Sequence, residues 1–340
     1  MRWLHRQLLD QQFTGSIGEL VEAVAGLNAQ TARGPIVGLW TRMSTLDLAE
    51  LDRALRGYEL VKANLMRGTV HLVTRRQYVT WRQALQPMLE RTVRGFVAGL
   101  WDRVDHDDLL HAGTELLRAH DGLTRAEIGR ALAPQFPVPD PRQLGFAIRL
   151  LLPVVQVADD HAFKPARTRY ILAEQAFDDA LIDADEGRLD LLRSFLRAFG
   201  PAAATDVSYW SGLTRLRPAL AEAATHAVEA DPAVGDAGPF DVEPIADSAP
   251  RSAFVLPEFD NVYFCSKNTD RPLINAKKRL VRSGAMPGSL VSGDQVCAHW
   301  RWTRPPELTQ LTPWHDLAPA ATDEFARFAR WAHAADEAVS

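Results

Sequence analysis

The chain has 340 residues, of which 46% are hydrophobic and 24% charged, with 38 basic against 43 acidic side chains. This is the composition of an ordinary globular protein, and the net charge of -5 excludes a simple polycation of the histone type. No apolar run reaches the roughly 18 residues that a membrane-spanning helix needs, and the two cysteines cannot supply a disulfide framework or a cysteine-based zinc site. The polar start does not match a signal peptide, so we expect a cytoplasmic protein. The length of the chain predicts two or three domains.

The first elements along the chain are predicted to be helices followed by a hairpin. Apolar residues recur at helical spacing, and Ser16 with Glu19 forms a capping box at the start of the second helix. A turn at Arg67-Gly68 separates two β-rich segments. This is the order of a winged helix. The predicted helices span 2–12, 17–27, 35–43 and 46–56, and the predicted strands span 59–66 and 69–73.

The same order recurs twice, which predicts one supersecondary unit used three times. A second capping box, Thr124 with Glu127, marks a helix in the second copy. The second copy has helices over 105–119 and 140–151 and strands over 153–157 and 161–164. The third has helices over 188–199, 205–212 and 213–224 and strands near 227–229 and 239–242. A non-repetitive helical protein with scattered strands remains the alternative.

Residues 250–304 have a different pattern and predict a small β-rich element, followed by a last helix over 322–335. Its expected strands are 254–256, 261–265, 290–291 and 296–303. The predicted fold class is therefore mainly α with small β-hairpins (α+β), comprising three tandem winged helices and a C-terminal β-rich element. The expected domain limits are 1–103, 104–186, 187–249 and 250–340.

The charges are unevenly placed along the chain. Residues 264–304 hold eight basic side chains against two acidic ones, whereas residues 221–250 hold seven acidic side chains and no basic one. A basic face on a near-neutral body is typical of a protein that binds a polyanion. Arginine far outnumbers lysine and suits bidentate phosphate contacts, although arginine content can also simply follow genomic base composition.

Two amide side chains, Asn28 and Gln30, follow the second predicted helix. They project the same way only if the segment is extended, and they could then present both amides to one substrate atom or one water. The alternative is that Asn28 caps the helix, since asparagine is common just after a helix end.

Arg67, Thr69 and His71 fall on one side of a predicted strand and suit phosphate contact, although an exposed strand face is often only solvated. The histidines form no metal-binding motif, and no glycine-rich nucleotide motif or serine nucleophile elbow is present. We therefore expect neither a metal nor a cofactor.

Two further segments have both a functional and a structural interpretation. Glu258 and Asp260 could form a carboxylate pair for acid–base chemistry, or the segment Leu256–Asn261 could be a turn in which Asp260 and Asn261 cap backbone amides. Trp300 and Trp302 alternate along a predicted strand and could stack on a base or belong to the core.

Several stretches together resemble the AlkZ/YcaQ family of bacterial DNA glycosylases, which are built from tandem winged helices. They occur in the family's order and cover nearly the whole chain. They are Gly26–Gln30, Arg67–Val73, Gly200–Ala202 followed by Asp206 and Tyr209–Gly212, and Leu256–Asn261.

The resemblance implies a protein that cups duplex DNA in a basic channel and removes alkylated purines, mainly N7-alkylguanines. The family's catalytic motif is Gln-x-Gln or Gln-x-Asp in the first winged helix. Gln30 matches its second position, whereas Asn28, one methylene shorter than glutamine, stands at the first. We expect Gln30 to position a water while Asn28 orients Gln30 or touches the deoxyribose.

The expected partner is duplex DNA bearing alkylated purines, bound by a monomer that does not associate with membranes. The expected function of the protein is excision of bulky adducts or unhooking of crosslinks, in DNA repair or in self-resistance to a genotoxic natural product. A non-catalytic winged-helix DNA-binding protein, regulatory or adduct-sequestering, is the alternative that Asn28 keeps open. An enzyme acting on an anionic small molecule is a third. The predicted phosphate contacts are Arg67, His71, Arg75, Arg76, Lys277, Lys278 and Arg279.

Overall fold

A computed structural model of the chain contains helices and small antiparallel sheets, as the sequence predicts. Its first helix, α1 (Arg2–Arg6), is shorter than predicted, because the chain leaves the helical region at Leu8, whose φ is 53°. No helix in the described part of the chain is long and apolar enough to cross a membrane. The structure describes residues 2–97, 99–158, 168–224, 226–227, 240–242, 251–267, 272–281, 285–303 and 309–339.

The first repeat is a winged helix with a three-stranded antiparallel sheet in the order β1-β3-β2. The Ser16–Glu19 capping box begins its first helix as predicted. A 3₁₀ turn, η1 (Met66–Gly68), joins the hairpin strands, and α5 (Arg75–Trp81) and α6 (Gln86–Phe96) lead out of the unit. Its elements are α2 (Ile17–Ala23), β1 (Leu27–Asn28), α3 (Gly34–Arg42), α4 (Leu48–Arg56), β2 (Leu60–Asn64) and β3 (Val70–Thr74).

The second repeat has the same topology, with the strand order β4-β6-β5. The capping box of Thr124 and Glu127 begins α8 as predicted. The predicted strand over 161–164 lies outside the described residues, and the strand that pairs with β5 is β6. The elements of this unit are α7 (His106–Arg118), β4 (Leu123–Thr124), α8 (Arg125–Leu132), α9 (Arg142–Leu151), β5 (Val154–Gln156) and β6 (Arg169–Leu172).

The third repeat follows α10 (Ala173–Ala176) and repeats the topology in reduced form. The pair β7-β8 forms its hairpin, and an isolated bridge between Ala202 and Phe240 takes the place of the third strand. Three successive units with one topology confirm the predicted fold class. The elements of this unit are α11 (Ala184–Phe199), α12 (Ala204–Ser211), α13 (Arg217–Ala223), β7 (His226–Ala227) and β8 (Phe240–Asp241).

The C-terminal element is a four-stranded antiparallel sheet in the order β12-β11-β10-β9. The strand predicted over 261–265 is wrong: this segment is the 3₁₀ turn η3 (Asn261–Phe264), because the Asp260 side chain caps the Val262 amide at 3.0 Å. The other elements are β9 (Ala253–Leu256), α14 (Pro272–Leu280), β10 (Gly288–Ser292), β11 (Gln295–Trp302), β12 (Thr309–Pro313) and α15 (Pro319–Val339).

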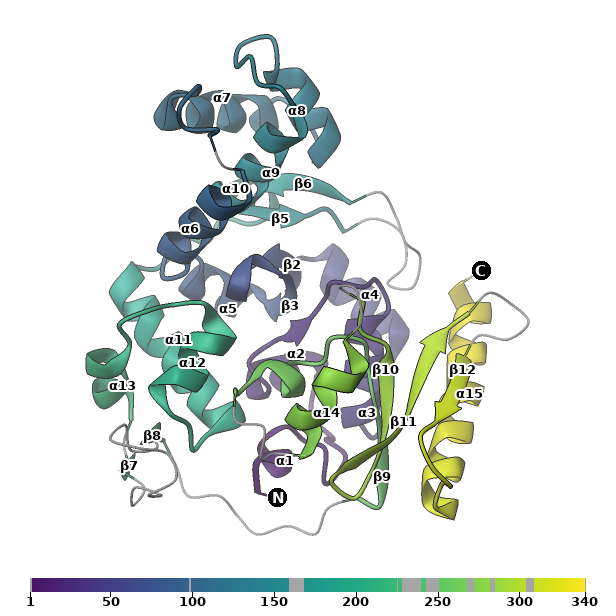
Figure 1. Ribbon diagram of the computed structural model, residues 1–340. Helices are drawn as coiled ribbons and strands as arrows, with labels where there is room; N and C mark the ends of the chain where they lie inside the picture. The colour runs from purple at the N-terminus through teal and green to yellow at the C-terminus, as the bar shows by residue number, and fades with distance from the viewer. Residues whose placement is uncertain are drawn as a thin grey trace.

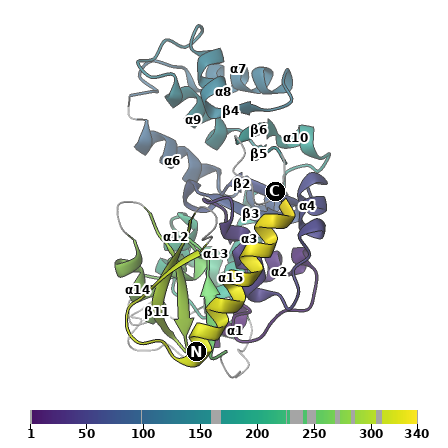
Figure 2. The same ribbon diagram turned by 90° about the vertical axis from the view of Figure 1, so that its right-hand side faces the viewer.

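The second repeat forms a separate upper lobe, reached through α6, above a body that contains the other units (Figure 1). In that body the first repeat lies between the helices of the third repeat and the C-terminal sheet. Helix α15 runs along the outside of the sheet (Figure 2), where Phe328 packs on Trp300 with 4.7 Å between ring centroids. The first repeat is therefore packed against both neighbours, and its β1 segment carries the predicted amide pair.

Candidate functional site

The segment with the two amides is extended because α2 ends earlier than predicted. Ala25 and Gly26 have positive φ values of 57° and 81°, and these two residues turn the chain from α2 into β1. A Cβ at Gly26 would lie 2.8 Å from a methyl carbon of Val73, so this bend needs glycine. Asn28 therefore lies in a strand, and the interpretation of Asn28 as a helix cap is wrong.

Asn28 and Gln30 contact each other directly. The Asn28 Oδ1 accepts a hydrogen bond from the Gln30 backbone amide at 3.0 Å, and its Nδ2 donates to Gln30 Oε1 at 3.4 Å. The first bond is an Asx turn, which fixes the backbone two residues on. Asn28 is buried, whereas Gln30 is exposed. The buried amide thus holds the exposed one, and Gln30 is the member of the pair that faces outward.

His71 lies behind this pair instead of on the surface. It is the register partner of Asn28 in the β1–β3 ladder and is fully buried, with Nδ1 3.0 Å from the Thr69 carbonyl oxygen. Burial and then the nearby Arg67 charge lower the pKa of His71 to about 3, so the imidazole is neutral at physiological pH. The expected exposure of His71 is wrong, because both faces of β3 are covered. Because the His71 side chain is not accessible to solvent in this conformation, it cannot contact a phosphate.

Arg67 lies in the hairpin turn with a positive φ of 57°. Its guanidinium donates to the Trp210 carbonyl oxygen and lies 5.2 Å from the Phe264 ring centroid. Burial lowers its pKa to about 10, so the group remains charged at neutral pH. Arg67, Tyr209 and Lys267 line a pocket of about 640 Å³. Its lining comes from the first repeat, the third repeat and the C-terminal element. We call this the basic pocket.

One basic residue of α14, Lys277, contacts Tyr209, which lines the same pocket. Lys277 donates to the Tyr209 hydroxyl, and its Nζ is 4.7 Å from the centroid of that ring. Lys278 and Arg279 are exposed, and the Arg279 guanidinium stacks on Trp314 at 3.9 Å. Tyr209 therefore connects Lys277 of α14 to the third repeat, and Arg67 lines the same pocket as Tyr209.

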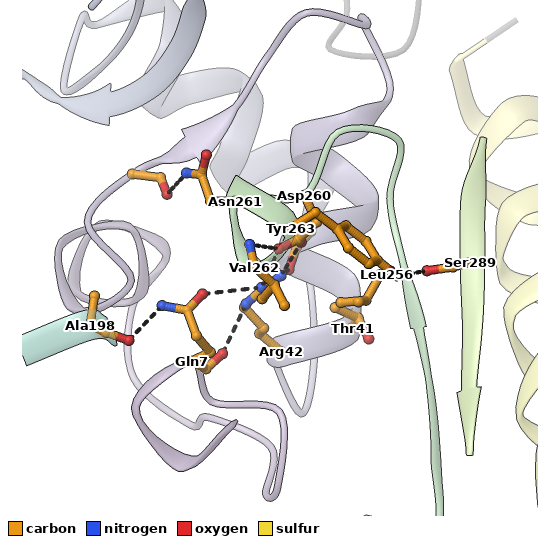
Figure 3. Close-up of polar contacts among 12 residues, drawn as sticks. Gln7, Thr41, Arg42, Ala198, Leu256, Asp260, Asn261, Val262, Tyr263 and Ser289 are labelled. Carbon is orange, nitrogen blue, oxygen red and sulfur yellow. Dashed lines mark hydrogen bonds and ion pairs between the residues drawn. The ribbon is translucent and has the colours of Figure 1, made fainter. Parts of the chain in front are cut away.

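The two carboxylates of the Leu256–Asn261 segment have separate surroundings. Asp260 is buried in an ion pair with Arg42, with N–O distances of 3.0 and 3.1 Å (Figure 3). Glu258 is instead at the edge of a small pocket, and burial raises its pKa. The turn interpretation is confirmed for Asp260, which caps the backbone amide of Val262 at the start of η3. It is wrong for Asn261, which caps no amide in the described part of the chain and instead donates to the Gly26 carbonyl oxygen at 3.1 Å. The carboxylate-pair interpretation has no geometric support.

The two tryptophans of β11 also differ from each other. Trp300 is buried against Phe328, so the interpretation as a core aromatic is confirmed for it. Trp302 is only half-buried, and the Arg33 guanidinium lies 4.4 Å from its ring centroid.

Comparison with known proteins assigns the chain to a family. The family model for the DNA glycosylase AlkZ-like proteins matches residues 21–333. The chain belongs to this family. Its fold is similar to that of the Streptomyces sahachiroi DNA glycosylase AlkZ, with a TM-score of 0.74 and 20% sequence identity over 97% of this chain and 94% of that one. No curated protein sequence matches the chain.

Membership in the AlkZ-like family supports DNA glycosylase function, with DNA as the partner. Within this family member, Arg75 and Arg76 are less suited to phosphate contact than the sequence predicts. Arg75 pairs with Asp179 at 3.5 Å, and Arg76 pairs with Glu22 at 2.8 Å and with Asp190 at 3.5 Å. These carboxylates neutralise the positive charges of Arg75 and Arg76, which would otherwise be available to bind a phosphate.

Sequence reasoning gave no role in the site to several residues that surround the predicted ones in this AlkZ-like protein. Tyr209 links α12 to α14, and Thr31 and Arg33 line the pocket that Glu258 borders. Thr31 follows Gln30 directly and Arg33 lies three residues after it, so their closeness in sequence to the amide pair was the available signal. Their contacts with Glu258 and Trp302 come from segments more than 200 residues away and leave no local pattern.

Proposed function

We propose that the chain excises N7-alkylguanines, including bulky adducts, from duplex DNA, with Gln30 and Asn28 as the catalytic pair. The observation that carries the proposal is the hydrogen-bonded amide pair, in which buried Asn28 holds exposed Gln30. The test is release of the free base, together with an abasic site, from a duplex that holds one N7-alkylguanine. The undamaged duplex should stay intact.

The chemistry of the damaged base explains why amides suffice. An N7-alkylguanine is already cationic, so its departure needs no proton from the enzyme. The water oxygen bonds to C1′ as the C1′–N9 bond breaks, and the electron pair of that bond neutralises the positive charge of the purine. The water's proton passes to solvent. The protein must therefore place the water and stabilise an oxocarbenium-like sugar, as in glycoside hydrolysis.

The two amides have separate roles in this proposal. Asn28 Nδ2 donates to Gln30 Oε1, which leaves a second lone pair of that oxygen able to accept a hydrogen bond from the attacking water. The Asx turn fixes the backbone of Gln30, and this fixes the position of the Cα from which the Gln30 side chain extends. Asn28 thus acts as the positioning residue, and Gln30 is the catalytic residue that contacts the water.

The DNA backbone would run across the basic pocket and α14. Arg67, Lys267 and Lys277 gather around Tyr209 and Phe264, and Lys278 and Arg279 continue the charge along α14. Such cations supply most of the sequence-independent affinity for DNA. The same hydrolysis at a guanine joined to the opposite strand would unhook a crosslink. Its biological setting would be DNA repair or self-resistance to a genotoxic natural product.

Neutralising α14 should reduce the salt dependence of DNA binding. A variant with Lys277→Ala, Lys278→Ala and Arg279→Ala no longer carries the three cations that would neutralise phosphates along this helix. The slope of log Kobs against log salt should then become shallower by roughly 0.9 for each phosphate that is no longer neutralised. Fluorescence anisotropy with a labelled duplex between low and moderate salt measures this slope.

The matched control is Arg118→Ala on α7, an exposed arginine already paired with Glu115 at 2.9 Å and Glu174 at 2.8 Å. It should leave the slope unchanged. A triple variant with the slope of the parent protein would remove α14 from the DNA interface.

A further inference from the structure

The basic pocket has an apolar interior and a cationic opening. Leu213 and Leu216 are buried and line its inner part, whereas Arg215, Arg217 and Lys267 are exposed at its opening. Its volume of about 640 Å³ is within the range of roughly 300–1,000 Å³ that holds small-molecule ligands. The lining therefore combines apolar surface inside with positive charge outside.

The positive charge of the pocket has no carboxylate partner. Neither Arg67 nor the three cations at the opening forms an ion pair in the described part of the chain, and the described lining contains no acidic residue. Asp206 of α12 accepts hydrogen bonds from the Ser266 hydroxyl at 2.7 Å and the Lys267 backbone amide at 3.3 Å, and pairs with none of these cations. The four charges are therefore available to an anionic ligand.

Two turns of the chain are fixed around the pocket. Arg67 and Arg215 both have a φ of 57°, a costly conformation for a residue with a side chain and one that clusters at ligand-binding positions. A Cβ at Gly212 would lie 2.8 Å from Met88 Cγ, so glycine is needed where the turn after α12 approaches α6. Arg91 of α6 donates to the Gly212 carbonyl oxygen at 2.8 Å and holds that turn. The pocket is therefore formed before a ligand binds.

The basic pocket is close to the amide pair but separate from it. Arg67 precedes His71 by four residues, so their Cα atoms are at most about 14 Å apart. His71 is the register partner of Asn28. Since base pairs are spaced about 3.4 Å apart along a duplex, DNA held at Gln30 reaches the pocket within a few base pairs. Neither Asn28 nor Gln30 lines the pocket, so the damaged guanine is not its occupant.

An unstacked nucleotide matches both parts of the lining. A passing duplex strand presents phosphates to the opening, but its stacked bases do not enter the interior. A nucleotide that has left the stack offers a flat base to Leu213 and Leu216, and its two flanking phosphates suit the bidentate geometry of arginine. The hydroxyls of Thr205 and Ser208 supply hydrogen-bond donors and acceptors for the base edge.

We propose that the basic pocket receives one unpaired, undamaged nucleotide of the bound DNA, with its base inside and its two phosphates at the opening. Such binding needs DNA as the partner but neither the amide pair nor base release, so it goes beyond the proposed function. A nucleotide that is already unpaired beside or opposite a lesion avoids most of the cost of unstacking. The pocket thereby holds distorted DNA in place while Gln30 contacts the damaged site.

The experiment compares three undamaged duplexes: one fully paired, one with a single extra adenine nucleotide and one with a single extra abasic residue. The two bulged duplexes have the same backbone and differ only in the base. Fluorescence anisotropy should give a Kd roughly tenfold lower for the adenine bulge than for the abasic bulge, because contacts to an unstacked base contribute an affinity of this order.

Two pocket variants and one control locate the contact. Thr205→Trp places an indole in the pocket from an exposed position and should bring the adenine-to-abasic affinity ratio close to one. Arg215→Gly removes a cation and suits the positive φ, so it should leave Tm nearly unchanged while weakening both bulged duplexes about fivefold more than the paired one. Arg142→Ala on α9, an exposed arginine paired with Asp140 at 3.0 Å, should change neither quantity.

The results separate a nucleotide pocket from a contact with the duplex backbone. Equal Kd values for the two bulged duplexes would overturn the proposal. It would also be overturned by an unchanged ratio in Thr205→Trp, or by an Arg215→Gly variant that weakens all three duplexes alike. Gln30→Ala should keep the ratio of the parent protein, so the test remains decisive even if the chain releases no base.

Discussion

Gln30→Ala is expected to slow release of N7-methylguanine from duplex DNA by at least about 100-fold while changing the Kd for the duplex less than about twofold. Positioning a water and accepting its hydrogen bond contributes on the order of 10²–10⁴ in rate. The exposed Gln30 amide makes its hydrogen bonds to Asn28 alone among the described residues, so its truncation leaves the fold intact. Single-turnover release of the free base, measured beside anisotropy binding, separates the two effects.

The matched control is Gln135→Ala, an exposed glutamine in the upper lobe, which should release the base at the parent rate. The rate of base release by Asn28→Ala should lie between those of Gln30→Ala and Gln135→Ala. In this variant Gln30 keeps its side-chain amide but loses the Asn28 amide that hydrogen-bonds to it. A Gln30→Ala protein with the parent rate would remove Gln30 from the catalytic machinery.

Asp260→Ala is expected to destabilise the protein by about 3–5 kcal/mol. The Arg42 guanidinium is fully buried, donates to both Asp260 oxygens, and also donates to the Gln7 carbonyl oxygen at 2.9 Å (Figure 3). Removing only the carboxylate leaves a buried charge without its counter-ion, and such losses are large. Urea unfolding followed by circular dichroism measures the change, and Tm should fall on the order of 10 °C.

The exposed pair Arg56–Asp52 on α4 is the control, with the same residue types at 2.7 Å. Asp52→Ala should cost less than about 1 kcal/mol, because exposed ion pairs contribute little. The double variant Arg42→Met with Asp260→Leu should recover most of the stability lost in Asp260→Ala. Equal destabilisation by Asp52→Ala and Asp260→Ala would contradict the assigned importance of the buried pair.

This ion pair also concerns the site. Asp260 belongs to the segment that carries Glu258 and Asn261, and Asn261 donates to the Gly26 carbonyl oxygen at the bend before Asn28. Arg42 lies at the end of α3, and the first residue of this helix, Gly34, lines the small pocket that Glu258 borders. The pair therefore fixes the C-terminal element against the first repeat on the side where the amides lie.

Sequence patterns predicted the order of elements because each repeat carries its own local signals. The capping boxes at Ser16 and Thr124 begin α2 and α8 as expected. The end of α2 was not predictable, since Ala25 gives no local signal for its left-handed backbone. That bend depends on contacts with Val73 and Asn261, which are distant in sequence.

The candidate site was only partly accessible from the sequence. Asn28 and Gln30 were identified by spacing and by family resemblance, but their hydrogen bond depends on the extended backbone that the α2 bend creates. His71 was predicted to be exposed because it is polar in a strand, yet β3 is buried on both faces. The Arg42–Asp260 pair joins residues 218 positions apart, and neither neighbourhood in sequence marks it.

The most direct measurement of the central claim uses the purified chain and a duplex with a single N7-methylguanine. Free base is quantified by mass spectrometry and abasic sites by alkaline strand cleavage, with the same duplex alone as the reference for spontaneous depurination. We predict equal amounts of free N7-methylguanine and abasic sites, formed far faster than in the reference. Tight binding with the base retained at the spontaneous rate would contradict catalysis by the Asn28–Gln30 pair and leave a DNA-binding protein in its place.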